Sequence, residues 1–291
     1  MSITCRSART DRTVDHLTAD DRRRMPEGHT LHRLALDLTD AFAGTKPQVS
    51  SPQGRFADSA ALLNGRECRG ADAHGKHLFV DFDDQLLHIH LGLIGKLRLA
   101  PPAPPLGQVR VRLATPQVAA DLTGPQLCVV RTPAEVRAEL ARLGPDPLQP
   151  DADPERAWNR IHRSGKPIAA LLMDQTVLSG VGNVYRAEVL FRQRIRPHVE
   201  GRKLARQSWL AIWDDLVTLM PQGVVDNRID TVRGEHSPEA MGRPPRVDDH
   251  GGEVYVYRRA QLPCHVCGSR IRTEVLEGRN LFWCGRCQRR N

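Results

Sequence analysis

Four cysteines near the end of the chain have the spacing of a metal site. They form two Cys-x2-Cys pairs, Cys264 with Cys267 and Cys284 with Cys287, and 16 residues separate the pairs. Two such pairs can close a tetrahedron of thiolates around Zn²⁺, and because no ligand position stays open the metal would be structural. The metal would replace a core that some thirty residues cannot build. We therefore expect one structural Zn²⁺ held by these four residues.

The segment between the two pairs alternates in polarity. Residues 270–283 have the pattern of a β-hairpin that turns near Gly278. Such a hairpin places Arg279 at its tip, where a guanidinium can bind a phosphate through two hydrogen bonds. A zinc ribbon of this kind suits many nucleic-acid-binding and protein-binding modules, so it does not specify the function.

A glycine-rich turn at residues 179–183, Ser-Gly-Val-Gly-Asn, joins two helical stretches and puts Asn183 at an N-cap position. Glycine lets the backbone approach a ligand closely, and the free N–H groups of the following helix can bind an anion. An ordinary helix–helix turn is the simpler interpretation, because glycine commonly ends helices.

Composition limits the function classes. The chain has 291 residues, 40% of them hydrophobic and 26% charged, and a net charge of +8. This length suffices for two domains, and the positive charge favours a polyanion such as nucleic acid. No apolar run approaches the roughly 18 residues of a membrane span, and residues 1–24 lack the apolar core of a secretory signal. We expect a cytoplasmic protein without a disulfide framework, in which the scattered Cys68 and Cys128 are buried.

The elements that must position these residues fall into two parts. Residues 1–24 are polar and unpatterned, which indicates disorder. An amphipathic helix is predicted from about residue 30 to residue 44, followed by strands at 77–82, 86–99 and 109–113. Several strands behind one leading helix indicate a β-sandwich or barrel.

A proline-rich break at residues 144–154 resembles an interdomain linker. The pattern beyond it is helical, with Asp153 or a neighbour capping a first helix and Lys166-Pro167 opening a second that runs to Gln175. A third helix is predicted to start at Asn183, and apolar residues between 205 and 219 mark a fourth. Residues 223–252 are rich in glycine, proline and charge, which predicts a long mobile loop.

Taken in order, these pieces resemble the formamidopyrimidine-DNA glycosylase and endonuclease VIII family. The matching segments are Met-Pro-Glu-Gly at 25–28, Gly-Lys-His-Leu at 75–78, His-Leu-Gly-Leu at 90–93, Leu-Met-Asp-Gln at 172–175 with Gly-Val-Gly-Asn at 180–183, and the cysteine cluster with Arg279 five residues before Cys284. The resemblance covers residues 25–291. It implies an α+β fold with an N-terminal β-sandwich and a leading helix, a helix-two-turn-helix region and a zinc finger, with DNA in the cleft between.

The resemblance also implies domain limits and a partner. Residues 25–146 would form the catalytic β-sandwich domain, 153–259 the helix-two-turn-helix DNA-binding domain and 260–291 the zinc finger, behind an extension at 1–24. The expected partner is double-stranded DNA with oxidised bases or abasic sites, bound by a monomer that contacts no membrane. The expected activity is that of a bifunctional DNA glycosylase and AP lyase of base excision repair.

The resemblance gives Pro26 the role of the nucleophile that attacks C1′ of the damaged nucleotide. An α-amino group titrates near pH 8, against about 10.4 for a lysine, so more of it is neutral at physiological pH. Because proline is a secondary amine, its iminium stays cationic and draws electrons through β,δ-elimination of the two phosphates. Glu27 would act as the general acid/base at the sugar ring. These two residues, with Lys76 and Arg279, are the expected catalytic residues.

Four residues are expected to bind DNA by the same resemblance. Lys76, Asn183 and Arg279 would hold phosphates beside the lesion, and Leu93 would fill the gap left by the flipped nucleotide. Taken alone, a solvated turn lysine is the commoner interpretation of Lys76. A strand leucine facing the core is an equally good interpretation of Leu93.

The nitrogen of Pro26 is an amide wherever residue 25 precedes it, and an amide cannot form the iminium. We expect the active chain to start at Met25, whose removal exposes Pro26. Thr30 stands where many family members have a glutamate, and residues 121–128 lack the Arg-x-Phe wedge of the purine-directed branch. Thr30 implies a different contact to the damaged base. The missing wedge and the Met-Pro-Glu-Gly start resemble the endonuclease VIII branch, which prefers oxidised pyrimidines.

Two alternatives stay open. One is a glycosylase for oxidised purines with the same mechanism, and the other is a non-catalytic zinc-finger DNA-binding protein whose N-terminal extension blocks Pro26. His88 and His90 lie two apart on a strand, but with no third ligand nearby they are expected to be core or surface histidines rather than metal ligands. No role is assigned to His29 or His32.

Overall fold

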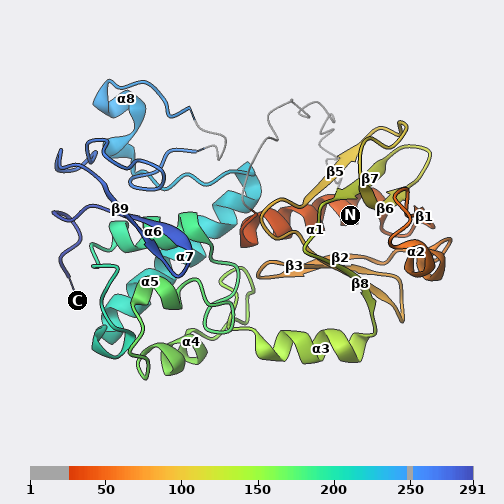
Figure 1. The fold of residues 1–291 in the computed structure, drawn as a ribbon, viewed down its shortest axis with the longest axis horizontal. Helices are drawn as coiled ribbons and strands as arrows, with labels where there is room; N and C mark the ends of the chain where they lie inside the picture. The colour runs from red at the N-terminus through yellow and green to blue at the C-terminus, as the bar shows by residue number, and fades with distance from the viewer. Residues whose placement is uncertain (1–25, 248–251, 291) are drawn as a thin grey trace, which may run out of the picture.

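The computed structural model describes residues 26–247 and 252–290, which form two halves side by side (Figure 1). The first half holds two four-stranded sheets, and the second is helical and ends in a two-stranded hairpin. This arrangement confirms the predicted α+β class, with strands after a leading helix and helices beyond residue 150. The extension predicted at residues 1–24 lies outside the described residues.

The elements of the first half are α1 (Gly28–Phe42), β1 (Gln48–Ser50), α2 (Ala57–Leu63), β2 (Gly70–His74), β3 (His77–Asp81), β4 (Leu86–His90), β5 (Lys96–Ala100), β6 (Val109–Ala114), β7 (Ala119–Thr123), β8 (Leu127–Arg131) and α3 (Pro133–Arg142). Those of the second half are α4 (Pro154–Ile161), α5 (Ile168–Leu171), α6 (Asn183–Arg192), the 3-10 turn η1 (Gly201–Lys203), α7 (Arg206–Asp226), the 3-10 turn η2 (Gly234–His236), α8 (Pro238–Met241), β9 (Arg272–Leu276) and β10 (Arg279–Trp283).

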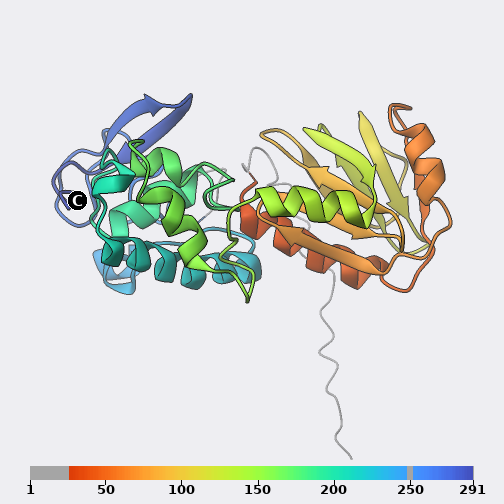
Figure 2. The same cartoon turned by 90° about the horizontal axis from the view of Figure 1, so that it is seen from below.

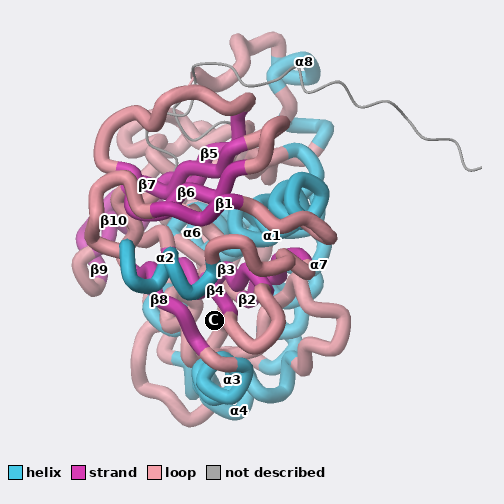
Figure 3. Tube along the Cα trace, turned by 90° about the vertical axis from the view of Figure 1, so that its right-hand side faces the viewer, coloured by secondary structure: helices cyan, strands magenta, loops and turns pink. Residues whose placement is uncertain are grey.

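The two sheets form a sandwich. Their strand orders are β1-β6-β7-β5 and β2-β3-β4-β8, and all neighbouring strands are antiparallel. Figure 3 shows the two layers one above the other. Leu78 and Ile89 of one sheet share a buried core with Val111 and Leu122 of the other. Apolar side chains at alternate strand positions meet in this way because successive residues of a strand point to opposite faces.

Helix α1 covers part of this core. It buries Leu31, Ala35, Leu38 and Phe42, which recur at helical spacing, and it packs closest to β2. The helix therefore has the amphipathic character predicted for it, with bounds that differ by two residues at each end.

The strand predicted at residues 86–99 is wrong as a single element. The chain leaves the first sheet after His90, turns through Gly92, and enters the second sheet as β5 at Lys96. Gly92 has a φ of +69°, a left-handed conformation that glycine adopts without strain. The apolar run continues through this turn, so periodicity alone did not reveal the crossing between sheets.

The helical half is built around α6. Residues 183–191 of this helix are all buried, and the surrounding core contains Trp209 of α7 and Leu281 of the finger hairpin. The C-terminal end of the chain lies at the outer end of this half, away from the sheets (Figures 1 and 2). Among the described residues, no helix combines the length and the apolar character that a membrane crossing requires.

Two predicted boundaries in the helical half are wrong. The helix predicted from Lys166 to Gln175 is limited to α5, because the chain enters tight turns after Leu172. The loop predicted from residue 223 begins later, since α7 continues through Pro221 to Asp226. Of the rest of that predicted loop, η2 and α8 are helical turns and residues 248–251 lie outside the described residues.

Candidate active site

A pocket of about 170 Å³ gathers residues from both halves. Its lining is Pro26, Glu27, Lys76, His90, Gly92, Leu93, Gln126, Met173, Gln175, Gly182, Asn183 and Arg279. The six residues singled out in the sequence for catalysis or DNA binding are all among them. They come from the start of α1, the β2–β3 turn, the β4–β5 turn, the start of α6 and the finger hairpin, so the fold brings together five segments that are remote in sequence.

Glu27 lies at the base of this pocket and is almost fully buried, with 1% of its surface exposed. Its Oε2 accepts hydrogen bonds from the backbone N–H of Gly182 (2.8 Å) and of Tyr185 (3.4 Å), and its Oε1 accepts from Val184 N–H (2.7 Å). The carboxyl group thus caps α6 from another part of the chain, at the end where N–H groups are free and a negative charge is favoured. Pro26, which precedes it, is partly exposed.

Asn183 is therefore not the N-cap that its position suggested. Asn183 is the first residue of α6 and the N-cap is Gly182. A glycine has no side chain that could cap the helix. The capping oxygen comes from Glu27, which is 155 residues away in the sequence.

Burial raises the pKa of Glu27 above its ordinary range, and Lys76 and the three N–H groups offset part of that rise. A carboxyl group held in this way keeps its proton more readily than an exposed glutamate and can donate it to a developing negative charge. The site can therefore supply a general acid directly next to the nitrogen of Pro26.

Lys76 follows Gly75 in the turn between β2 and β3. Gly75 has a φ of +57°, and its N–H donates to Oδ2 of the buried Asp146 (2.7 Å). A Cβ at Gly75 would lie 2.8 Å from Cβ of Ser179, so the turn fits directly against the glycine-rich segment. Burial lowers the pKa of Lys76, and Glu27 offsets part of this shift. Both halves thus hold the lysine in place.

Asn183 contacts the finger hairpin at the residue next to Arg279. Asn183 Nδ2 donates to the carbonyl of Asn280 (3.0 Å), the residue after Arg279. Arg186, one turn later in α6, donates to Asn183 Oδ1 and to the same carbonyl (3.1 Å). Arg279 itself is the first residue of β10, beside the turn at Gly278, as the hairpin pattern predicted. Helix α6 therefore fixes the finger hairpin at the pocket.

Leu93 lies in the β4–β5 turn with 56% of its surface exposed. The interpretation of this residue as a core-facing strand leucine is therefore wrong. Gly92 before it packs on Gln126, with a Cβ at Gly92 placed 2.8 Å from Cβ of Gln126. An exposed leucine at the rim of a pocket is available to contact a bound molecule.

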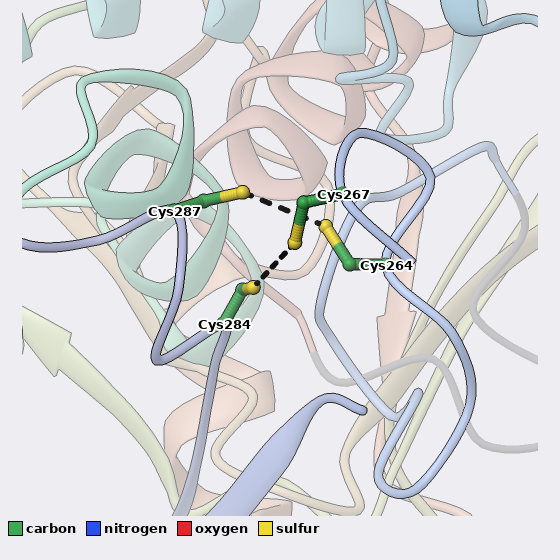
Figure 4. Close-up of side chains that lie close together, drawn as sticks. All are labelled: Cys264, Cys267, Cys284 and Cys287. Carbon is green, nitrogen blue, oxygen red and sulfur yellow. Dashed lines mark hydrogen bonds between the residues drawn. The ribbon is translucent and has the colours of Figure 1, made fainter. Parts of the chain in front are cut away.

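The four cysteines of the C-terminal cluster converge (Figure 4). The sulfur atoms of Cys264 and Cys287 are 3.8 Å apart and those of Cys267 and Cys284 are 3.5 Å apart. Tetrahedral Zn²⁺ with metal–sulfur bonds of about 2.3 Å places its ligands about 3.8 Å from each other. The geometry fits one structural zinc ion, which joins the two ends of the finger and so supports the hairpin that carries Arg279.

The histidines of β3 and β4 form a cluster next to the pocket, which His90 lines. His77 Nδ1 lies 2.8 Å from Nε2 of the buried His88, and the ring centroids of His77 and His90 are 5.0 Å apart. Burial, helped by the neighbouring charges, lowers the pKa of His77 to about 3 and that of His88 to about 4. They are thus packed, neutral histidines.

Several residues of the site were not found in the sequence. Arg186 and Gln126 have no motif of their own, and Asp146 was assigned only to a linker. Asp146 is fully buried and accepts hydrogen bonds from His32 Nε2 (2.8 Å), Gly75 N–H and Leu148 N–H (3.0 Å). Nothing in the sequence indicated that Asp146 is buried, because a Pro-Asp-Pro sequence is typical of an exposed turn.

Three family models match this chain. The formamidopyrimidine-DNA glycosylase N-terminal domain matches residues 25–126, the H2TH domain of the same glycosylases matches residues 143–233, and the zinc finger found in FPG and IleRS matches residues 261–290.

Individual proteins match over nearly the whole chain. The endonuclease 8 1 of Mycobacterium tuberculosis is 52% identical over 271 residues, which cover 91% of this chain and 100% of that protein. The probable endonuclease 8 2 of Streptomyces coelicolor is 32% identical over 282 residues, or 91% and 94% of the two chains. Among solved structures, Lactococcus lactis Fpg in complex with DNA that contains N7-benzyl-Fapy-dG has a TM-score of 0.76 at 23% identity and covers 91% of this chain and 100% of that chain, which supports the fold.

Proposed function

The chain belongs to the formamidopyrimidine-DNA glycosylase and endonuclease VIII family, it is a base excision repair DNA glycosylase with AP lyase activity, and we propose that Pro26 is its nucleophile. One observation carries this proposal. Pro26 shares a single pocket with Glu27, Lys76, Asn183 and Arg279, which supply an acid and three groups that can bind phosphate oxygens.

In the proposed reaction the ring nitrogen of Pro26 forms a bond to C1′ of the damaged nucleotide. The base leaves with the electron pair of the glycosidic bond and takes up the proton that the nitrogen of Pro26 loses. Glu27 protonates the ring oxygen as the bond between that oxygen and C1′ breaks and the sugar opens. The resulting iminium is a cation without an N–H, so it accepts the electron pair released when a proton leaves C2′. The 3′ phosphate departs in that step, and the 5′ phosphate departs in a second elimination.

The other residues of the pocket hold the substrate. Lys76, Asn183 and Arg279 contact the phosphates around the lesion, and Leu93 enters the stack in place of the extruded nucleotide. The partner is a DNA duplex with an oxidised base or an abasic site. The enzyme acts as a monomer in the bacterial cytoplasm, at the nucleoid.

The active form begins at Pro26. Residue 25 is where the N-terminal family model begins, and 91% of this chain accounts for the full length of the mycobacterial relative. Removal of Met25 from a chain that starts there turns the nitrogen of Pro26 from an amide into a secondary amine. The proposed domains are a catalytic sandwich at 25–146, a DNA-binding helical domain at 153–259 and a zinc finger at 260–291.

Oxidised pyrimidines are the preferred substrates. The 52% identity to an endonuclease 8, Thr30 in place of a glutamate, and the absence of an Arg-x-Phe sequence at residues 121–128 support this branch. Duplexes that carry 5-hydroxyuracil or 8-oxoguanine distinguish the branches under single-turnover conditions. Faster incision of the 8-oxoguanine strand would reject the pyrimidine preference and leave the mechanism intact.

Borohydride trapping tests the nucleophile. The Pro26-initiated protein, its Pro26→Gly variant and the full 291-residue chain are incubated with the lesion duplex and sodium borohydride, and intact mass confirms each N-terminus. We expect a covalent protein–DNA adduct with the Pro26-initiated protein and a strongly reduced yield with the other two. Incision by a chain whose mass still includes residues 1–25 would overturn the assignment of Pro26. Absence of both adduct and incision in all three forms would favour a non-catalytic DNA-binding protein.

A further inference from the structure

Four arginines of the zinc finger surround a second hollow, outside the pocket described above. The hollow has a volume of about 540 Å³, and its lining includes Arg270, Arg272, Arg286 and Arg289. All four side chains are exposed. None of them takes part in an ion pair with a carboxylate among residues 26–247 and 252–290, and no acidic residue lines the hollow.

The two cysteine knuckles fix the position of these arginines. Arg286 lies between the ligands Cys284 and Cys287, and Arg289 follows two residues later. Arg272 is the first residue of β9, and a Cβ added at Gly285 would lie 2.8 Å from its guanidinium carbon. The guanidinium of Arg272 thus lies against the backbone of the second knuckle. Four like charges therefore line one hollow, and their mutual repulsion is relieved when an anion binds there.

The chemistry of the lining favours phosphate oxygens. Guanidinium groups bind phosphate through paired N–H donors, and Ser269 and Gln261 add polar groups to the wall. No aromatic side chain is in the lining, so a base would find no surface on which to stack. Ile271 is the only apolar lining residue, and it is fully buried, so a peptide would find no apolar anchor there. The hollow therefore suits a sugar-phosphate backbone better than a free nucleotide or a peptide.

The position of the hollow relative to the pocket indicates which sugar-phosphate backbone it can bind. Arg272 pairs with Trp283 at one end of the β9–β10 hairpin, and Arg279 pairs with Leu276 at the other end. The two ends are four residue steps apart along the strand, about 13 Å at 3.3 Å per residue. B-DNA carries a phosphate every 3.4 Å of its axis on each strand, so a duplex bound at Arg279 has further phosphates within reach.

We propose that Arg270, Arg272, Arg286 and Arg289 form a second phosphate-binding site that holds the DNA duplex a few base pairs away from the extruded nucleotide. This site contacts the sugar-phosphate backbone only and is independent of the lesion. It increases the affinity for damaged and undamaged duplexes alike. The inference rests on the proposed function, since it takes the DNA bound at Arg279 as its reference point.

Two double variants, R270Q/R272Q and R286Q/R289Q, test the site in the zinc-loaded protein. We expect each to bind a 30-base-pair undamaged duplex about ten-fold more weakly at 100 mM salt, and the slope of log K against log salt to fall by about 2 units, one per lost phosphate contact. The variant R137Q/R142Q, which removes the same charge from α3 in the other half, is the matched control and should retain the wild-type slope. Zinc content and the trapping yield at saturating DNA should be unchanged in all three.

Duplex length gives a second readout. The lesion is placed near either end of a duplex, with three base pairs on one side of it and fifteen on the other. The difference in affinity between wild type and the double variants should persist with one placement and disappear with the other, because only one arm reaches the hollow. Wild-type affinity and salt slope in both double variants would overturn the proposal. If the substitutions abolish binding of a polyglutamate peptide and leave DNA affinity unchanged, the proposal is overturned in favour of an acidic protein partner.

The outcomes are distinguishable from a failure of the proposed function. If the Pro26-initiated wild type forms no borohydride adduct, the catalytic assignment fails, whatever the arginine variants do. If the adduct forms and the arginine variants bind like wild type, only the second phosphate site is rejected.

Discussion

Oε2 of Glu27 and the backbone nitrogen of Gly182 are 2.8 Å apart, across the boundary between the sandwich and the helical half. This contact joins the residue beside the proposed nucleophile to the helix that carries Asn183. It requires a glycine at position 182, because a Cβ there would lie 2.4 Å from the carboxyl carbon of Glu27. The φ of Gly182 is −119°, which other residues also adopt, so the requirement is one of space.

Gly182→Ala should therefore displace the Glu27 carboxyl group and leave the backbone able to fold. We expect single-turnover incision to slow on the order of 100-fold, because a shift of about 1 Å in a catalytic group has that effect. Gly165→Ala is the control, since a Cβ at that position has no neighbour within 4 Å. The rates are compared on a 5-hydroxyuracil duplex and on a preformed abasic site. Equal rates for the two variants would show that Glu27 does not need this position.

Asp146→Asn tests the network beneath Lys76. The carboxylate of Asp146 accepts from His32, Gly75 and Leu148, and these bonds hold the pKa of Asp146 below its ordinary value despite its burial. The amide nitrogen that this substitution introduces would face one of these N–H donors, and two donors cannot form a hydrogen bond with each other. We therefore expect a loss of about 2–4 kcal/mol in the free energy of unfolding. Urea unfolding at pH 7.5 measures this loss.

The matched control is Asp37→Asn, the same substitution in α1, the helix that also carries His32. Asp37 pairs with Arg33 on α1 (2.8 Å), where both side chains are partly exposed, and such pairs contribute little. Its unfolding midpoint should stay within experimental error of the wild type. A similar small change in Asp146→Asn would mean that the Lys76 turn does not depend on the carboxylate.

Local patterns identified much of this molecule. The cysteine spacing, the finger hairpin and helix α1 each depend on residues within about thirty positions of one another, and for these the structure agrees with the prediction. Contacts between segments that are remote in sequence could not be predicted from local patterns. Nothing in the sequence near Gly182 indicates that Glu27 supplies its helix cap, and nothing near Pro147 indicates that Asp146 is buried.

Errors in the predicted elements have physical causes of the same kind. Proline disfavours a helix interior, yet α7 continues past Pro221 because its far end packs against α1. Gly223 lies within that contact, with a Cβ position 3.2 Å from Cγ of His29 in α1, and Arg33 of α1 donates to the carbonyl of Val225 (3.1 Å). Tertiary contacts thus outweigh the local preference that suggested a loop from residue 223 onward.

Loss of the zinc should uncouple the finger from the pocket. Cys284→Ser removes one of four ligands, and we expect the zinc content to fall from one ion per chain to a small fraction of that. DNA affinity should fall at least ten-fold, since Arg279 is placed by a hairpin whose ends the metal joins. Cys128→Ser, outside the cluster, is the control and should retain the metal. Metal is quantified by atomic emission after gel filtration; full DNA affinity in a zinc-free protein would contradict this role of the finger.

The histidine pair next to the pocket should make the fold sensitive to mild acid. The pKa values of His77 and His88 are about 3 and about 4 in the folded chain, against about 6.5 for an unperturbed histidine. Between pH 6.5 and pH 4 the unfolded chain binds protons that the folded chain does not, so the free energy of unfolding falls as the pH falls. Above pH 6.5 both states are neutral at these positions and the contribution is complete.

The double variant H77Q/H88Q isolates this contribution. Both proteins are unfolded in urea at pH 8 and at pH 5, and the quantity compared is the decrease in unfolding free energy between the two pH values. We expect that decrease to be smaller in the variant by on the order of 2 kcal/mol, after allowance for partial solvent screening of His77. Glu27 acts in the opposite direction, since its raised pKa gives a contribution that is lost as the pH rises, and it is common to both proteins. An equal decrease in wild type and variant would show that the pair is protonated in the folded state.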